Sequence, residues 1–185
     1  LTYLSLSKCG LRHLKLRDCG NLLDISSLAA CTLLEHVDIS GSCGITDISS
    51  LAALTLLKHL DMSRLWQVVD ISPLAACKEL QHLGMGGCNH ITDLYPLSSC
   101  TQLRYLDLSQ NSSSHTITHL TTCSMLEYLD MNYCSSIEII SPLAAFKELQ
   151  ELRLNSCRKI CDISPLAGCT KLRKVDLGGC PALRV

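Results

Sequence analysis

Histidine recurs every 23 residues in the first half of the chain, and tyrosine continues the series at the same spacing. Its members are His13, His36, His59, His82, Tyr105 and Tyr128. Imidazole changes charge near neutral pH, and both side chains combine apolar area with hydrogen-bonding tips. The series indicates either a tolerated residue copied by duplication or a contact surface. If it is a contact surface, protonation would make neighbouring imidazoles repel, so partner affinity is expected to fall below about pH 6.

Aspartate lies two residues after several members of this series. These aspartates are Asp38, Asp61, Asp107 and Asp130. With the histidines and the following serines they contain the residue types of a catalytic triad, as in His36, Asp38 and Ser40. Side chains that project in parallel from one open strand have no convergent pocket and no oxyanion donor. The sequence therefore predicts no enzyme activity and no catalytic residues.

Thirteen cysteines occur in 185 residues, and most lie in two columns of the repeat where Ser, Asn, Leu or Phe replace them. This pattern is typical of a small buried apolar side chain. The odd total and the placement in columns favour free thiols in a reducing compartment, with the cytoplasm as the predicted location. Cys157 and Cys161 have no matching histidine cluster, so we expect no metal and no cofactor.

A leucine motif sets the spacing of all these columns. The string LxxLxL, with Val or Met sometimes replacing Leu, begins every 23 residues from Leu11 to Leu172. Its fourth and sixth positions alternate as in a half-buried strand of about five residues, so the third and fifth positions face solvent. Downstream, the segment ISPL places Ser at a helix N-cap and Pro at the first helical position, which predicts a short helix or 3₁₀ turn. Because one coil cannot bury its own leucines, stacked coils must share a core.

The repeat unit, approximately LxxLDLSxCxxITDISPLAACxx, resembles leucine-rich repeats over residues 11–185. Its cysteine at the ninth position resembles F-box protein repeats, ITDISPL is similar to bacterial internalins, and the combination is most similar to trypanosomatid leucine-rich repeat proteins. The resemblance implies an α/β fold: a curved solenoid with parallel strands on the concave face and short helical or 3₁₀ turns on the convex face. It also implies a role in binding other proteins.

The repeats divide the chain into a partial N-terminal repeat, residues 1–10, and a repeat domain, residues 11–185, with seven full repeats and a truncated eighth. Neither end shows a polar capping sequence, so we expect a fragment of a longer protein. Leu4 and Leu6 occupy strand-type places, yet the next repeat begins at Leu11. Either the first ten residues form a hairpin-like cap or thirteen residues are missing between Gly10 and Leu11; we favour the missing segment.

Three further features interrupt the pattern. In the fifth repeat, Ser114 stands at an apolar place and His119 replaces Pro, which predicts an irregular convex turn. In the fourth, glycines remove three side chains from the strand and its end, and these are Gly84, Gly86 and Gly87. They are either side chains that nothing needed or a notch for a partner. Trp66 lies at the rim, packed against the adjacent turn or exposed as an interaction anchor.

Composition excludes several classes of protein. A chain with 47% hydrophobic and 18% charged residues is neither disordered nor collagen-like, and it lacks the roughly 18 uninterrupted apolar residues of a membrane helix. A net charge of −1 gives no overall reason to expect nucleic acid or membrane binding. The middle of the chain is acidic and both ends are basic.

The sequence predicts a non-enzymatic protein-interaction module. Its concave face, at the histidine, tyrosine and aspartate positions named above, would bind a basic or mixed-charge protein, with no small-molecule substrate and no membrane. One alternative is a structural subunit of a large intracellular assembly, ciliary or ribonucleoprotein, whose basic C-terminal repeats meet phosphate. Another is substrate recognition for a ubiquitin ligase, suggested by the F-box-like cysteine.

Overall fold

Each 23-residue repeat forms one coil of a solenoid. The computed structural model describes residues 2–6, 10–112 and 116–183. Within them, one parallel sheet runs in chain order through β1 (His13–Lys15), β2 (His36–Asp38), β3 (His59–Asp61), β4 (His82–Gly84), β5 (Tyr105–Asp107), β6 (Tyr128–Asp130), β7 (Glu151–Arg153) and β8 (Lys174–Asp176). The 3₁₀ turns are η1 (Ser26–Ala30), η2 (Ser49–Ala53), η3 (Ser72–Ala76), η4 (Tyr95–Ser99), η5 (Thr118–Thr122), η6 (Ser141–Ala145) and η7 (Ser164–Gly168).

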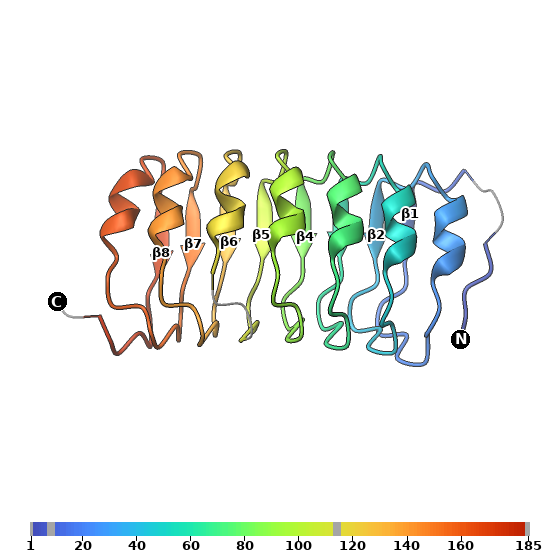
Figure 1. The fold of residues 1–185 in the computed structure, drawn as a ribbon, viewed down its shortest axis with the longest axis horizontal. Helices are drawn as coiled ribbons and strands as arrows, with labels where there is room; N and C mark the ends of the chain where they lie inside the picture. The colour runs from blue at the N-terminus through green and yellow to red at the C-terminus, as the bar shows by residue number, and fades with distance from the viewer. Residues whose placement is uncertain (1, 7–9, 113–115, 184–185) are drawn as a thin grey trace.

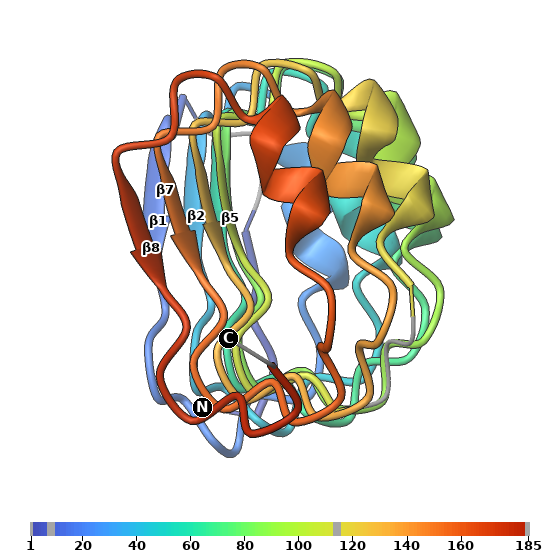
Figure 2. The ribbon, with the colours of Figure 1, turned by 90° about the vertical axis from the view of Figure 1, so that its left-hand side faces the viewer.

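The strands and the 3₁₀ turns lie on opposite sides of the core. Figure 1 shows the coils side by side, and Figure 2, turned by 90°, separates the sheet from the layer of turns. The predicted solenoid is confirmed, with strands of three residues instead of about five. No helix in the described ranges is long and apolar enough to cross a bilayer.

Leucines that alternate along the strands form the shared core. Leu60, Leu83, Leu106 and Leu129 are all 0% exposed. Parallel pairing sets them in register, Leu60 beside Leu83 and Leu106 beside Leu129. Because side chains alternate across a strand, their neighbours in the third and fifth positions must face solvent. The buried leucine columns are confirmed, whereas the fifth-position column is less open than predicted, since Asp38 and Asp130 are only 8% and 7% exposed.

The entry to five of the 3₁₀ turns, η1 to η4 and η7, is capped by an aspartate and not by the predicted serine. Ser72 is the first residue of η3, Ile71 occupies the N-cap place, and no side-chain cap bond forms there. Oδ1 of Asp70 accepts the Ser72 amide at 2.7 Å, and Asp24, Asp47, Asp93 and Asp162 make the equivalent bond. An Asp side chain that binds the amide two residues later mimics a backbone turn. The N-cap prediction for serine was therefore wrong, and these aspartates organise the entry to their turns instead.

Every coil leaves its strand through a residue in the left-handed region of the backbone map. The eighth position has φ between 53° and 74° in each repeat, at Asp18, Gly41, Arg64, Gly87, Gln110, Tyr133, Ser156 and Gly179. Only Gly adopts this conformation without a steric cost. Gly87 is therefore explained by the turn it makes.

The ninth position, which follows, donates a hydrogen bond to the previous coil. Sγ of Cys88, Cys134, Cys157 and Cys180 lies 3.0–3.2 Å from a carbonyl oxygen 26 residues earlier. Ser42 and Asn111 make the same bond, at 2.6 and 2.9 Å. Burial raises the pKa of the Cys88 and Cys134 thiols to about 12, which keeps the S–H donor in place. These cysteines are hydrogen-bond donors as well as small apolar side chains.

Two predicted irregularities turned out differently. Tyr3 pairs in parallel with Asp24, and the Leu4 amide donates to the Asp24 carbonyl at 3.2 Å. Residues 2–6 therefore lie beside the segment that enters η1, and the strand-type placement of Leu4 and Leu6 was wrong. The path through residues 7–9 lies outside the described residues, so the missing-segment prediction stays open.

The fifth repeat also departs from its prediction. Its turn η5 has the same five-residue length as the other turns, although His119 replaces Pro. Leu120 is buried like the corresponding leucines of η1 to η4 and η6, so the backbone does not need the proline ring here. The irregular convex turn was a wrong prediction for η5, and Ser114 lies outside the described residues.

Candidate functional site

The solvent side of the sheet, which we call the strand face, carries a continuous stack of aromatic rings. We call the stack the ring ladder, and its members are His13, His36, His59, His82, Tyr105 and Tyr128. Ring centroids are 4.3 Å apart between β1 and β2, between β2 and β3, and between β5 and β6. The spacing is 3.9 Å between β4 and β5 and 5.6 Å between β3 and β4. Parallel register, which places like positions side by side, produces this stacking.

Three histidines of the ladder have a pKa shifted toward the neutral form. Burial is the main cause that lowers the pKa of His36, His59 and His82. Neighbouring imidazoles lower it further at His36 and His59, while Asp61 and Asp107 pull the pKa of His82 upward without reversing the shift. Nδ1 of His36 is buried without a partner, so a proton added there finds no acceptor. His36, His59 and His82 therefore favour the neutral form.

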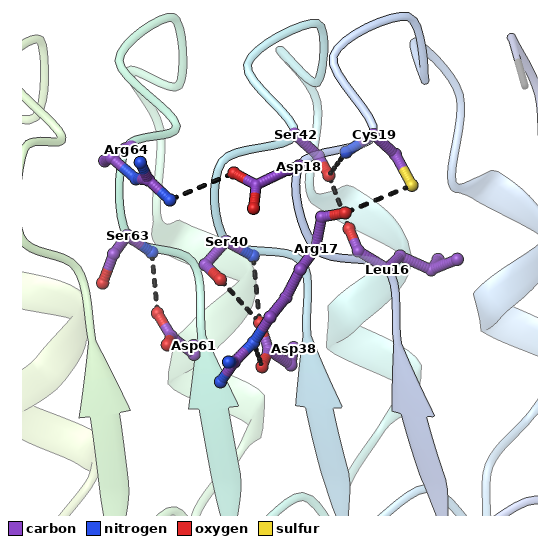
Figure 3. A network of polar contacts seen from close by, with 10 residues as sticks. All are labelled: Leu16, Arg17, Asp18, Cys19, Asp38, Ser40, Ser42, Asp61, Ser63 and Arg64. Carbon is purple, nitrogen blue, oxygen red and sulfur yellow. Dashed lines mark hydrogen bonds and ion pairs between the residues drawn. The ribbon is translucent and has the colours of Figure 1, made fainter.

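Beside the ladder lies the acid row, which consists of Asp38, Asp61, Asp107 and Asp130. Each carboxylate first caps its own strand, because Oδ1 accepts the amide two residues later. The distances are 3.2 Å to Ser40, 3.0 Å to Ser63, 2.8 Å to Ser109 and 2.8 Å to Asn132. Figure 3 shows the first two bonds. Sequence reasoning missed this structural role, although the recurring Asp-x-Ser and Asp-x-Asn pattern was its signal.

The chain's own arginines occupy the two ends of the acid row. Arg17 donates to Oδ2 of Asp38 (Figure 3). At the other end the Arg153 guanidinium lies 5.3 Å from the centre of the Tyr128 ring, and its Nη1 is 3.6 Å from Oδ2 of Asp130. Among the residues with described positions, no ion pair engages Asp61 or Asp107. The middle of the row is therefore its unpaired part.

A shallow groove of about 190 Å³ follows the first four strands between the ladder and the acid row. Its walls include His36, Asp38, His59, Asp61 and His82. Pockets that enclose a small molecule are usually larger, roughly 300 Å³ or more. An open groove of this size suits side chains that project from another polypeptide.

The possible triad residues are not arranged for catalysis. Oγ of Ser40 donates to Oδ1 of Asp38 at 2.7 Å, so the hydroxyl is directed to the carboxylate and not to His36. A nucleophile needs its base within hydrogen-bond reach. In residues 2–6, 10–112 and 116–183, no group of three or more His, Cys, Asp or Glu could hold a metal ion.

Comparison with known proteins explains the repeat. Residues 78–122 and 124–168 match the family model "Leucine Rich repeats (2 copies)". These two segments are leucine-rich repeats. A comparison with curated proteins found no match.

Solved structures share the leucine-rich repeat fold. An internalin, InlF of Listeria monocytogenes, is 25% identical with a TM-score of 0.65, over 91% of this chain and 61% of its own. The leucine-rich repeat domain of the type III effector XopL is 19% identical with a TM-score of 0.76, over 94% of this chain and 62% of its own. The plant peptide hormone receptor RGFR1, solved in complex with RGF2, is 16% identical with a TM-score of 0.65, over 98% and 35%. The chain spans less than two thirds of each of these three structures.

The glycines of the fourth leucine-rich repeat leave less open space than a notch would. A Cβ on Gly84 would lie 2.8 Å from Oδ1 of Asp61, and a Cβ on Gly86 would lie 2.7 Å from Oγ of Ser109 and 3.0 Å from Oδ2 of Asp107. Polar side chains from the flanking strands therefore lean over β4. The vacated space is lined by oxygen atoms.

Trp66 is exposed over part of its surface, and its role as an interaction anchor stays a prediction. It is 47% exposed and lines a rim groove together with Arg64 and Asp18. Arg64 forms a 3.0 Å ion pair with Asp18 (Figure 3). A Cβ on Gly41 would lie 2.1 Å from Oδ1 of Asp18. Gly41 therefore makes room for this bridge.

Three basic side chains of the C-terminal repeats form ion pairs within the chain. Lys171 pairs with Glu148 at 2.6 Å, and both Lys174 and Arg153 pair with Glu151, at 2.9 and 2.8 Å. These acidic partners offset the positive charge that the sequence alone showed there. A phosphate-binding surface in these repeats therefore has less free charge than its composition suggested.

Proposed function

We propose that this solenoid is a non-enzymatic module that binds another protein through its strand face. The ring ladder carries the proposal, because aromatic side chains that are already stacked lose little freedom on binding and are enriched in interface centres. Leucine-rich repeat proteins generally mediate protein–protein interaction, and RGFR1 was solved with a bound partner, RGF2. The binding residues proposed are those of the ring ladder and the acid row.

The proposal includes a reducing, intracellular compartment, with the cytoplasm favoured. Its support is the set of ninth-position cysteines, because Cys134 and Cys157 each donate an S–H hydrogen bond that oxidation would remove. A likeness of the 23-residue cysteine-bearing repeat to trypanosomatid leucine-rich repeat proteins belongs to the same proposal.

Affinity purification in reducing buffer tests the function. The variant Tyr105→Ala/Tyr128→Ala removes two ladder rings. The matched control, Tyr95→Ala/Tyr133→Ala, removes two tyrosines that are 62% and 56% exposed outside the ladder. We expect the ladder variant to lose one dominant partner that the control and the wild type retain. Retention of that partner by the ladder variant would overturn the proposal.

A further inference from the structure

An open groove at the edge of the strand face, which we call the rim groove, has a volume suited to a small ligand. The volume is about 330 Å³, above the roughly 300 Å³ at which small-molecule sites begin. The groove is lined by Asp18, Gly41, Cys43, Arg64, Trp66, Gly87, Asn89 and Gln110. It shares no residue with the ring ladder or the acid row.

Trp66 gives the rim groove an aromatic surface. It is the only tryptophan of the chain, and 47% of it is exposed. Cys43 and Asn89 hold the same repeat position in the flanking coils, so the indole is the largest side chain in this part of the rim. An indole offers a wide apolar face together with an N–H donor. A ligand that binds here therefore needs an apolar face of its own.

The Arg64 side chain extends along the same part of the rim. A Cβ on Gly87 would lie 3.5 Å from Cγ of Arg64, and a Cβ on Gly41 would lie 3.1 Å from its Nη2. Nη2 donates to Oδ1 of Asp18 at 3.0 Å (Figure 3). The two glycines leave space for the side chain to lie across the neighbouring coils, and 67% of it stays exposed. Its remaining N–H donors therefore face solvent beside Trp66.

The polar groups of the rim groove are planar and balanced in charge. The charged residues in its lining are Arg64 and Asp18, which pair with each other. Asn89 and Gln110 add two exposed carboxamides. In the described part of the chain, the Arg64–Asp18 bond is the one hydrogen bond between side chains of this groove. Because each carboxamide offers donors and an acceptor in one plane, the groove suits a neutral ligand rich in hydrogen-bonding groups.

We propose that the rim groove binds a neutral sugar. A pyranose ring has a face of C–H groups that fits the Trp66 indole, and its hydroxyls both donate and accept hydrogen bonds. A charged ligand would have to compete with the ion pair between Arg64 and Asp18. An aliphatic side chain would cover the carboxamides without replacing their hydrogen bonds to water, which is unfavourable. The inference is independent of the proposed function, because it uses other residues.

The single tryptophan reports binding directly. The intact chain is titrated with maltose, cellobiose, lactose and N,N′-diacetylchitobiose while the Trp66 emission is recorded. We expect at least one disaccharide to change the emission saturably, with a dissociation constant on the order of 1 mM. Raising the salt concentration from about 50 to about 500 mM should leave that affinity unchanged, since the ligand is uncharged. The proposal is overturned if none of the four sugars gives a saturable change, or if binding is strongly salt-dependent.

Substitutions locate the site, and saturation-transfer NMR on the sugar protons measures them, since it does not need the tryptophan. Trp66→Ala should weaken binding at least about tenfold, because it removes the stacking surface. Asn89→Ala/Gln110→Ala should weaken it about tenfold, because the hydroxyls lose their partners. The control is Tyr133→Ala, which removes a 56% exposed tyrosine that does not line the groove. Equal losses in Trp66→Ala and Tyr133→Ala would overturn the site.

A charge variant tests the class of ligand. Arg64→Gln/Asp18→Asn removes both charges of the rim groove and keeps planar polar groups in their place. A neutral sugar should bind this variant within about threefold of the wild type, because an exposed ion pair contributes little. Loss of binding in this variant would contradict a neutral ligand.

A further pair of probes separates the two sources of such a sugar. The disaccharide that binds is compared in its free form and linked to the asparagine of the peptide acetyl-Gly-Asn-Gly-amide, with the bare peptide as the blank. Equal affinities assign the sugar alone as the ligand, and a clearly tighter glycopeptide assigns a glycosylated protein. Binding of the bare peptide would overturn the sugar proposal in favour of a peptide groove.

Discussion

The two halves of the ring ladder have the same geometry and different chemistry. Rings on β2 and β3 are 4.3 Å apart, as are those on β5 and β6, but the first pair is imidazole and the second phenol. Burial lowers the pKa of His36, His59 and His82 and raises that of Tyr105 and Tyr128, so these rings favour the neutral form. Only the histidine half can acquire charge between pH 5 and 8. The repeat fixes the stack, and the residue type decides whether pH can act on it.

The largest effects are expected in the core, where the two halves should not differ. Leu60→Ala lies beneath the histidine half and Leu129→Ala beneath the tyrosine half, and both leucines are 0% exposed. Each substitution should lower the free energy of unfolding by about 2–5 kcal/mol, the cost of lost burial plus a cavity. Urea denaturation followed by circular dichroism measures it. A clear difference between the two variants would show that the halves differ below the surface as well.

Removal of a single ring should have the next largest effect on stability, and the loss should differ between the two halves of the ladder. Tyr128→Ala removes contacts with the Tyr105 ring and the Arg153 guanidinium, and a 3.3 Å hydrogen bond to Asp130. We expect a loss of about 2 kcal/mol, from one aromatic pair, one cation–π contact and one hydrogen bond. His13→Ala removes the exposed first ring of the ladder, which has a single ring neighbour. We expect it to lower the free energy of unfolding by less than about 1 kcal/mol. Equal losses in the two variants would contradict the larger contribution that we expect from Tyr128.

Regular columns made most of the fold predictable, because each residue's environment is repeated in the next coil. The buried Leu60 and the solvent-facing third and fifth positions followed from period-two alternation. The N-cap failed because two signals competed: Ser72 and Asp70 are both capping residues, and only the backbone shows that Asp70 reaches the amide. Propensity alone does not decide between them.

The sequence predicted which repeat positions form the candidate site, but it did not predict the contacts between their side chains. The ladder and the acid row could be read from the spacing, since register aligns equal positions. That Arg153 turns onto Tyr128, or that Asp61 leans over Gly84, depends on side-chain conformations that the sequence does not specify. The pairing state of the acid row therefore required the structure.

Acid should destabilise the histidine half alone. The folded-state pKa of His36, His59 and His82 lies below the ordinary value of 6.5, so the unfolded chain takes up protons first as the pH falls. The stability that the neutral rings contribute is complete above pH 6.5 and is lost as the pH falls through the folded-state pKa. The effect should be smaller than ring removal, because the rings stay in place.

Denaturation midpoints between pH 8 and pH 5 measure this dependence. The variant His36→Tyr/His59→Tyr/His82→Tyr should have a flatter profile than the wild type, whereas Tyr105→Phe/Tyr128→Phe should keep the wild-type slope. Glu35 faces His36 but has a pKa of about 2, so it stays charged throughout this range. A triple variant as pH-dependent as the wild type would place the titrating groups outside the ladder.

The smallest expected difference concerns two arginines. Arg64 pairs with Asp18 where both side chains are about two thirds exposed, 67% and 70%, so Arg64→Gln should change the free energy of unfolding by less than about 0.5 kcal/mol. Arg153→Gln removes the cation that covers the last ladder ring and balances Asp130, which is only 7% exposed. We expect a loss of about 1 kcal/mol, since the stacked guanidinium is partly desolvated and its removal leaves a buried carboxylate without its cation. High salt should reduce the Arg64 effect more than the Arg153 effect, because exposed pairs are the more strongly screened. Equal losses in both variants would mean that Arg153 acts as an ordinary surface charge, and Tyr128 would then end the ladder without a cation stacked on it.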